Sequence, residues 1–345
     1  MRRRIFLQIG TGTMMAIAAH GCTPSNSPQA TTSSASPASS TAPAAENPGK
    51  IVIAYPTIAA GLPFFYAVEK GLFKDAGLDV EAQKVPSPQQ IVEGMIAGRI
   101  QGCSNGTATG SLAVADAASP GLFRIIASNP TNSKYVLDQV IVAKDSPIQS
   151  IADLKGKKVG CGPGPQNQAI AKGLLEKNGV TDAEVIQLDI SQHPNAVASG
   201  QLAAAYTLEP IGTLGQLKGL TRTLESGVVA KYILGDPMAP WFGGSAALTT
   251  KFIQAYPETT KKYINVYRQA VDVVRKTPDA ARPFLEKYTP IKGNLIQSVP
   301  IPNYQMYDEL SASDLEYFQK FFDFLQQSGV LSKKVEAAPL IYKPA

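Results

Sequence analysis

Residues 144–164 have the sequence KDSPIQSIADLKGKKVGCGPG, which carries the signals of a newly starting α/β unit. Ser150, with Asp153 three residues later, forms a capping box and predicts a short helix. Residues 158–161 predict a strand between a polar turn and a Gly/Pro loop. Pro165 follows at the first turn of a helix, where the missing N–H of proline costs nothing. A second α/β domain is therefore predicted to begin in mid-chain.

The sequence before this stretch has the same glycine and proline pattern as the sequence after it, at a fixed offset of 102 residues. The matched positions are Pro63 with Pro165, Gly71 with Gly173, Gly77 with Gly179 and Gly98 with Gly200. Shared capping rules alone could produce two similar units, but matches in one register without a gap favour duplication of one design. Both alternatives predict two similar α/β lobes.

Strands and helices alternate along the folded part of the chain. Strands are predicted at residues 50–55, 78–85, 99–104, 122–128 and 135–143, with helices at 63–70, 87–97 and 107–117. Later helices at 252–276, 279–288 and 313–327 have apolar stripes and are predicted to pack on the first lobe. The alternation predicts a mostly parallel sheet in each lobe, flanked by helices. The predicted lobe boundaries are 49–138 with 238–345 for the first lobe, and 139–237 for the second.

Residues 1–22 are predicted to be an export signal. Arg3 and Arg4 precede a short apolar core in the twin-arginine form, and that core is too short to span a membrane. Cys22 follows a small residue, as in a bacterial lipoprotein cleavage box, which predicts a lipidated (palmitate-bearing) cysteine anchored to the membrane. The alternative is a chance cysteine in an ordinary signal peptide. Residues 23–48, rich in Ser, Thr, Ala and Pro, are predicted to be a flexible tether.

Composition argues against several classes of function. Three of the five net positive charges belong to Arg2, Arg3 and Arg4, so nucleic-acid binding is not expected. His193, predicted at the surface, is the only histidine after the leader, which argues against a catalytic triad and a histidine-rich metal site. No cofactor is expected. A dinucleotide-dependent enzyme is the alternative suggested by residues 160–165. Pro163 argues against it, because it removes an N–H that should face phosphate.

Three segments resemble the nitrate/sulfonate/taurine-type solute-binding proteins of ABC importers, a family that includes thiamine-pyrimidine precursor binders. They are residues 55–80 with KGLF and GLDV, residues 145–160 with DLKGKKVG, and residues 199–210 with SGQ and EP. The resemblance implies a two-lobed type II periplasmic-binding fold. It also implies a monomeric, exported binding protein that is not an enzyme and serves a permease and an ATPase. A pyrimidine synthase shares the fold, but its cysteine-rich motif is absent here. Gln101 and Ala203 depart from the family pattern, which usually has Asp at both positions.

A ligand cleft is predicted between the lobes, because open α/β sheets bind ligands beyond the carboxyl ends of their strands. The candidate ligand-binding residues are Tyr55, Phe64, Asn105, Thr107, Asp138, Gln166, Asn167, Tyr206, Glu209 and Trp241. The crossings between the lobes are expected near Asp138 and residues 236–241. Cys103 and Cys161 are expected near the cleft mouth as free, partly buried thiols, since a disulfide would lock the hinge.

The candidate residues include two acids, Asp138 and Glu209, with Tyr and Trp but no Lys or Arg. This set predicts a nitrogenous cation or heterocycle, guanidinium-like or pyrimidine-like, held by charge-assisted bonds and cation–π contact. A sulfonate such as taurine, or nitrate, is the alternative ligand. Another alternative is that the acids bond hinge backbone and contact no solute.

Overall fold

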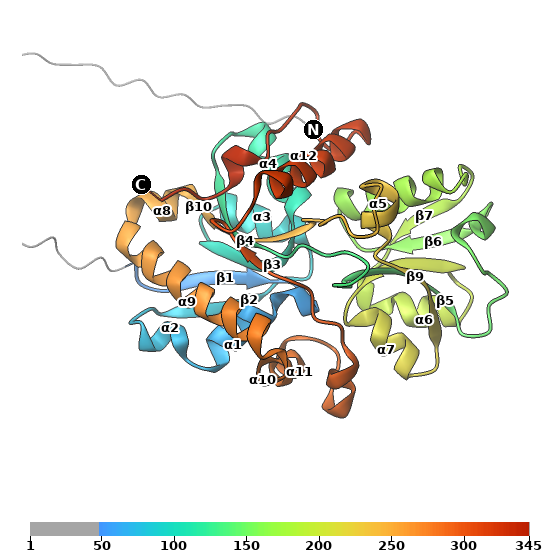
Figure 1. Cartoon of the computed structure of the whole chain (residues 1–345), viewed down its shortest axis with the longest axis horizontal. Coiled ribbons are helices and arrows are strands. Elements are labelled where there is room, and N and C mark those ends of the chain that lie inside the picture. Colours follow the sequence, from blue (N-terminus) through green and yellow to red (C-terminus); the bar gives the residue numbers. More distant parts are fainter. Residues whose placement is uncertain (1–47, 345) are drawn as a thin grey trace, which may run out of the picture. The chain divides into compact units, whose positions relative to one another are not determined.

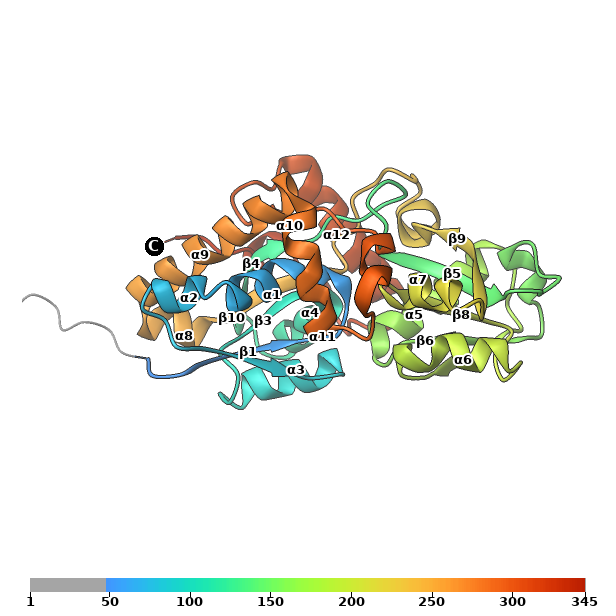
Figure 2. The same ribbon diagram turned by 90° about the horizontal axis from the view of Figure 1, so that it is seen from below.

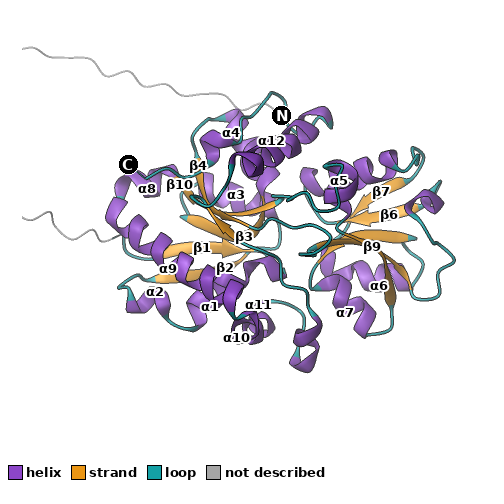
Figure 3. Ribbon diagram, viewed as in Figure 1, coloured by secondary structure: helices purple, strands orange, loops and turns teal. Residues whose placement is uncertain are grey.

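The computed structural model describes residues 48–344, which form two α/β lobes (Figure 1). The predicted export signal, Cys22 and most of the predicted tether lie outside the described residues. Each lobe is built on one sheet with helices on both faces (Figure 3). Among residues 48–344, no helix combines the length and the apolar character that crossing a membrane requires.

The first sheet has six strands in the order β11-β4-β10-β3-β1-β2. They are β1 (Ile51–Tyr55), β2 (Val80–Lys84), β3 (Gly102–Ala108), β4 (Phe123–Ser128), β10 (Gly244–Thr249) and β11 (Gln305–Met306). β1 is parallel to β2 and β3, whereas β10 is antiparallel to β3 and β4. The helices between the first four strands are α1 (Leu62–Glu69), α2 (Leu72–Asp75), α3 (Pro88–Ile96) and α4 (Thr109–Ala118).

The second sheet has five strands in the order β7-β6-β8-β5-β9. They are β5 (Asp138–Ala143), β6 (Lys158–Cys161), β7 (Glu184–Gln187), β8 (Ala204–Leu208) and β9 (Thr221–Ser226). β6 is parallel to β7 and β8, and β5 is antiparallel to β8 and β9. The helices of this lobe are α5 (Pro165–Lys177), α6 (His193–Ala198) and α7 (Ile211–Leu217). The predicted capping box of Ser150 and Asp153 is present and begins a single 3₁₀ turn, Ile151–Leu154.

The two sheets have the same design, strand by strand. The order β2-β1-β3-β10-β4 in the first corresponds to β7-β6-β8-β5-β9 in the second. Among these five matched strands of each sheet, the single antiparallel strand, β10 or β5, is the one that the chain enters from the other lobe. Gly77 and Gly179 have φ of 75° and 70°, and Gly98 and Gly200 have 73° and 76°. The predicted fold class is confirmed. The match of Gly71 with Gly173 is not conformational, because Gly71 has φ 70° whereas Gly173 lies inside α5.

The C-terminal region differs in detail from the prediction. The helix expected at 252–276 is divided into α8 (Thr250–Ala255) and α9 (Pro257–Lys276), because the residue before a proline avoids helical geometry. Likewise, 279–288 comprises α10 (Pro278–Ala281), a 3₁₀ turn at Arg282–Phe284 and α11 (Leu285–Tyr288). Figure 2 shows α9 beside α1, and the two helices pack on the first sheet.

The helix α12 (Ala312–Gln327) contacts both lobes. Its Phe318 stacks on Phe242 with ring centroids 4.9 Å apart. Its Phe324 lies against Gly173 of α5, where a Cβ would come within 2.8 Å of the ring. The predicted packing on the first lobe therefore extends to the second, and α12 joins the cores of both lobes in one apolar cluster.

Candidate functional site

Two chain segments connect the sheets and run antiparallel to each other. The Thr131 N–H donates to the Trp241 carbonyl over 3.1 Å, and the Trp241 N–H donates back to Thr131 over 2.9 Å. The Ser133 N–H donates to the Pro237 carbonyl over 2.9 Å. A pair of adjacent connections can act as a hinge, because a few backbone dihedrals then control the angle between two rigid lobes.

A small pocket of about 30 Å³ lies between the lobes, where the carboxyl ends of β3 and β8 meet. Its lining residues, none of them charged, are Ile58, Pro88, Gly106, Ala108, Leu137, Gln166, Asn167, Leu208, Trp241, Gly243 and Gly244. A space of this size holds water but no organic solute, so solute entry requires the lobes or the lining side chains to move.

Gln166 bridges the two lobes at this pocket. Its side-chain Oε1 accepts from the Gly110 N–H of α4 over 2.6 Å. Its Nε2 donates to the Gly243 carbonyl over 3.0 Å. Both lobes also meet where the Ala59 N–H donates to the Glu209 carbonyl over 2.9 Å. These contacts hold the lobes close together around the pocket.

Trp241 lines the pocket and carries a buried donor that has no acceptor. The side chain is 2% exposed, and its ring meets Phe321 edge-on with centroids 5.8 Å apart. Its Nε1–H has no hydrogen-bond partner within residues 48–344. A buried donor without a partner is unfavourable, so an acceptor brought by a solute would relieve that cost. Asn167, the third predicted residue at the pocket, donates from Nδ2 to the Pro163 carbonyl over 3.0 Å.

Four predicted residues of the first lobe do not line this pocket. Tyr55 and Phe64 belong to an aromatic cluster, in which Tyr55 meets Phe65 edge-on at 5.3 Å. Asn105 is fully buried and accepts from the Tyr267 hydroxyl of α9 over 2.7 Å. Thr107 is also fully buried, and its Oγ1 has no partner in the described chain.

The predicted acids and Tyr206 also lie away from the pocket lining. Asp138 is 1% exposed, and its Oδ2 accepts from the Val229 N–H over 3.0 Å. Burial raises the pKa of Asp138 to about 6. Tyr206 is 2% exposed, and its hydroxyl has no partner among residues 48–344.

Glu209 uses its carboxylate within the protein. It is 2% exposed, accepts from the Thr213 N–H over 3.2 Å and accepts from Gln139 Nε2. Burial raises its pKa, although these bonds counteract that effect. The arrangement matches the alternative in which the acid supports the local backbone at the start of α7.

Three further predictions need correction. His193 is fully buried rather than at the surface, its Nε2 lies 3.1 Å from the Leu188 carbonyl, and burial lowers its pKa to about 4.

Cys103 is the second residue of β3, so it lies far from the carboxyl end where the pocket is. Cys103 and Cys161 are both free thiols, as predicted, but they are fully rather than partly buried. Burial raises the pKa of Cys103 to about 11 and of Cys161 to about 12, which disfavours thiolate chemistry.

Sequence reasoning missed the glycines of the pocket. Gly106 has φ 90° within β3, and a Cβ there would lie 2.7 Å from Ile58. A Cβ on Gly243 would lie 1.9 Å from the Trp241 ring, and one on Gly244 would lie 2.9 Å from Gly106. Glycine inside a strand marks a close approach of backbone or ligand, so Gly106 and the Gly243–Gly244 pair were the available signal.

A larger cavity of about 840 Å³ lies elsewhere, at the edge of the second sheet where β6 and β8 begin. Its lining includes Lys144, Asp145, Asp153 and Lys157. We favour the smaller pocket as the functional site, because ligands of open α/β sheets bind at the carboxyl ends of strands. Among residues 48–344, no cluster of three or more His, Cys, Asp and Glu side chains could hold a metal ion.

Two similar α/β lobes, with paired connections and a pocket between strand carboxyl ends, define the class of two-lobed solute-binding proteins. The chain belongs to the NMT1/THI5-like family, whose model matches residues 60–281. This confirms the resemblance to solute-binding proteins of ABC importers that the sequence motifs indicated.

The fold is similar to that of two sulfonate-binding proteins. The periplasmic aliphatic sulphonate binding protein SsuA of Escherichia coli has a TM-score of 0.68 and 19% identity, covering 86% of this chain and 93% of that one. The alkanesulfonate-binding protein SsuA of Xanthomonas axonopodis pv. citri, bound to MOPS, has a TM-score of 0.69 and 21% identity, covering 86% and 99%. A Bacillus subtilis (strain 168) protein assigned to aliphatic sulfonate binding is 23% identical over 286 residues, which cover 81% of this chain and 82% of that protein.

Proposed function

We propose that this protein is the exported solute-binding component of an ABC importer. It captures a small solute between its lobes and delivers it, unconverted, to a separate permease and ATPase. The observation that carries the proposal is the uncharged pocket at the strand carboxyl ends, bounded by both lobes and by the paired connections. We further propose that the protein acts as a monomer held to the membrane through a lipid on Cys22.

We propose an organosulfonate as the solute. A sulfonate offers oxygen acceptors. The pocket is lined by Trp241, whose buried Nε1–H has no partner within the described residues, and by Gln166 and Asn167 of the first turn of α5. Helix N-termini favour anionic groups because their first N–H groups lack intrahelical partners. The sulfonate-binding relatives support the same class.

A nitrogenous cation has less support than the sequence indicated. That preference depended on Glu209 and Asp138, and neither side chain lines the pocket. Glu209 already accepts two hydrogen bonds from the protein, and burial favours the neutral form of Asp138. A cation in this pocket would therefore lack a carboxylate partner.

The experiment is a calorimetric titration of residues 49–345 with ethanesulfonate, using Trp241→Phe as the test variant. Phenylalanine keeps an aromatic ring in place but removes the Nε1–H donor. We expect affinity to fall roughly 10- to 100-fold, the effect of losing one hydrogen bond to a charged group. Met238→Ala, an exposed position on the same connection, is the matched control and should bind as the wild type does. If Trp241→Phe and the wild type bind ethanesulfonate with equal affinity, the Trp241 Nε1–H does not contact the solute.

A further inference from the structure

The helix α4 begins without a capping side chain of its own. Its N-cap residue is Ala108, whose side chain has no oxygen that could accept a hydrogen bond from the first turn. The first N–H groups of a helix need acceptors from outside it. The Thr109 N–H finds one in the Gly243 carbonyl over 3.0 Å, and the Gly110 N–H finds one in Gln166 Oε1 over 2.6 Å.

Gln166 belongs to the other lobe, in the first turn of α5. Its side chain is 3% exposed, and its Nε2 also donates to the Gly243 carbonyl over 3.0 Å. The approach is close: a Cβ on Gly110 would lie 2.7 Å from Oε1. One neutral amide thus provides both the acceptor that Gly110 needs and a second donor to Gly243.

We propose that Gln166 is a capping residue supplied across the cleft, and that it stabilises the closed arrangement of the lobes. This rests on the proposed function only in assuming that the lobes open and close. When the lobes separate, the Gly110 N–H loses its acceptor and must be hydrated. Gln166 is therefore a positioning residue for closure, and it lines the pocket in which the solute would be enclosed.

The test needs no solute. Hydrogen exchange of residues 49–345, followed by mass spectrometry, reports the protection of the Gly110 amide. Solution X-ray scattering of the same samples reports the radius of gyration. In Gln166→Ala we expect exchange at Gly110 to accelerate roughly 2- to 30-fold, the range for loss of a helix cap, together with a larger radius of gyration.

Gln168→Ala is the matched control. Gln168 is two residues further along α5, and its side chain makes no hydrogen bond to the other lobe within the described residues. The Gln168→Ala protein should have the same hydrogen exchange at Gly110 and the same radius of gyration as the wild type. Gln166→Glu is a second variant for the case in which the alanine variant does not fold, since a carboxylate can accept from Gly110 but cannot donate to Gly243. It should open the lobes relative to the wild type.

Ala108→Ser provides a rescue experiment. A serine at the N-cap offers its own oxygen to the first turn of α4. Combined with Gln166→Ala, it should restore protection of the α4 amides but leave the radius of gyration large, because the new cap does not join the lobes. Wild-type exchange and scattering in Gln166→Ala would overturn the proposal. Because the exchange result is independent of any solute, it can fail while the proposed function stands.

Discussion

Two buried titratable groups in the second lobe affect stability with opposite dependence on pH. Asp138 has a pKa raised by burial from 3.8 to about 6, so between these values the folded protein binds a proton that the unfolded chain lacks. Its contribution makes the protein less stable as pH rises through that window. His193 has a pKa lowered by burial from 6.5 to about 4, so there the unfolded chain binds the extra proton. Its contribution makes the protein more stable as pH rises.

The two contributions should nearly cancel between about pH 4 and about pH 6, and single substitutions should reveal them. In Asp138→Asn, the free energy of unfolding should rise with pH more steeply than in the wild type, by at most about 1.4 kcal/mol per pH unit. In His193→Gln, the slope of the free energy of unfolding with pH should be lower than in the wild type by a similar amount. Urea unfolding at about pH 4.5 and about pH 5.5 measures both slopes. Slopes equal to that of the wild type would show that neither group is buried in its neutral form.

Glu209 distinguishes the two ligand classes. Because its carboxylate is bonded to Gln139 and Thr213 rather than facing the pocket, Glu209→Gln should leave sulfonate affinity within about 2-fold of the wild type. Calorimetry with ethanesulfonate and with guanidinium measures this. A selective loss of guanidinium binding of about 10-fold or more would support a nitrogenous cation as the ligand, because a loss of that size requires a charge-assisted bond.

The sequence identified the strand that ends at the pocket but not which of its residues face it. Asn105 and Thr107 of β3 were predicted, whereas Gly106 and Ala108 line the pocket. Side chains alternate between the two faces of a strand, so an error of one residue exchanges every inward position for an outward one. The prediction favoured Asn105 and Thr107 because they are polar. In the structure, Asn105 forms a hydrogen bond within the first lobe and Thr107 is buried in it.

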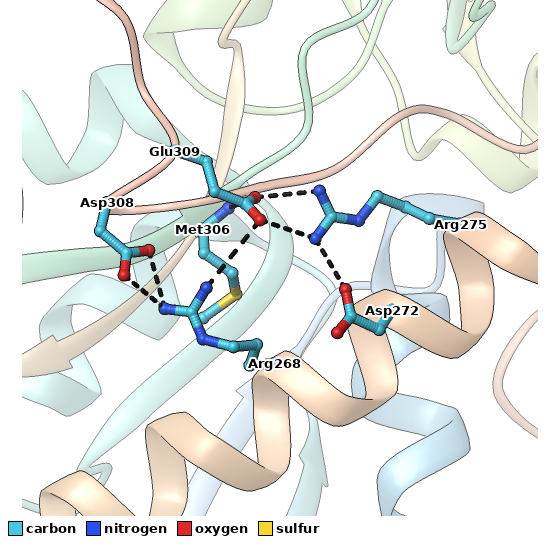
Figure 4. Close-up of polar contacts among 6 residues, drawn as sticks. All are labelled: Arg268, Asp272, Arg275, Met306, Asp308 and Glu309. Carbon is cyan, nitrogen blue, oxygen red and sulfur yellow. Dashed lines mark hydrogen bonds and ion pairs between the residues drawn. The ribbon is translucent and has the colours of Figure 1, made fainter.

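At the scale of elements, an ion-pair network attaches residues 306–309 to α9 (Figure 4). Glu309 forms a bidentate pair with Arg275, with N–O distances of 2.8 and 3.0 Å, and accepts from the Met306 N–H over 2.8 Å. Arg268 holds both carboxylate oxygens of Asp308 at 2.7 and 2.8 Å. Bidentate pairs within a network contribute more than isolated surface pairs do. This network therefore secures the end of the edge strand β11.

Glu309→Gln should lower the free energy of unfolding by about 1–2 kcal/mol, because it weakens the pair with Arg275 and a backbone bond together. The loss should be smaller at high salt, since partly exposed charges are screened. Urea unfolding at low and high salt measures it. Glu81→Gln, which breaks the isolated and exposed pair with Lys50, is the control and should have no measurable effect. A Glu309→Gln loss no greater than that of the control would contradict a role for the network.

Sequence patterns located most elements because caps and prolines act locally. The strand at 158–161 and the start of α5 at Pro165 agree with the prediction, and Ser150 and Asp153 form the predicted capping box. The partner of α12 could not be predicted in the same way. Its aromatic stripe shows that one face is buried, but periodicity does not identify the surface that buries it.

At the scale of the whole molecule, the repeat in the sequence predicted two lobes of one design. What it could not predict is the exchange of strands, in which β5 and β10 each enter a sheet from the opposite lobe. That exchange brings Trp241, Gly243 and Gly244 to the pocket, because the returning connection leads directly into β10. In this chain, the Gly243–Gly244 pair that follows Trp241 and Phe242 therefore marks the crossing.

The anchoring proposal is tested in cells that express the full chain. Cys22→Ser removes the thiol that would carry the lipid, so the protein should move from washed membranes to the soluble extracytoplasmic fraction. Its affinity for ethanesulfonate should not change, because Cys22 is not among the residues that line the pocket. If Cys22→Ser protein remains in washed membranes, the anchor is not a lipid on this cysteine.

The proposed function requires that the lobes enclose an organosulfonate without converting it. This is tested by calorimetric titration of wild-type residues 49–345 with ethanesulfonate, followed by mass spectrometry of the released solute. We expect saturable binding of one solute per chain and recovery of ethanesulfonate unchanged. Absence of binding to any sulfonate while guanidinium binds, or recovery of a converted product, would show that the protein is not an organosulfonate-binding protein.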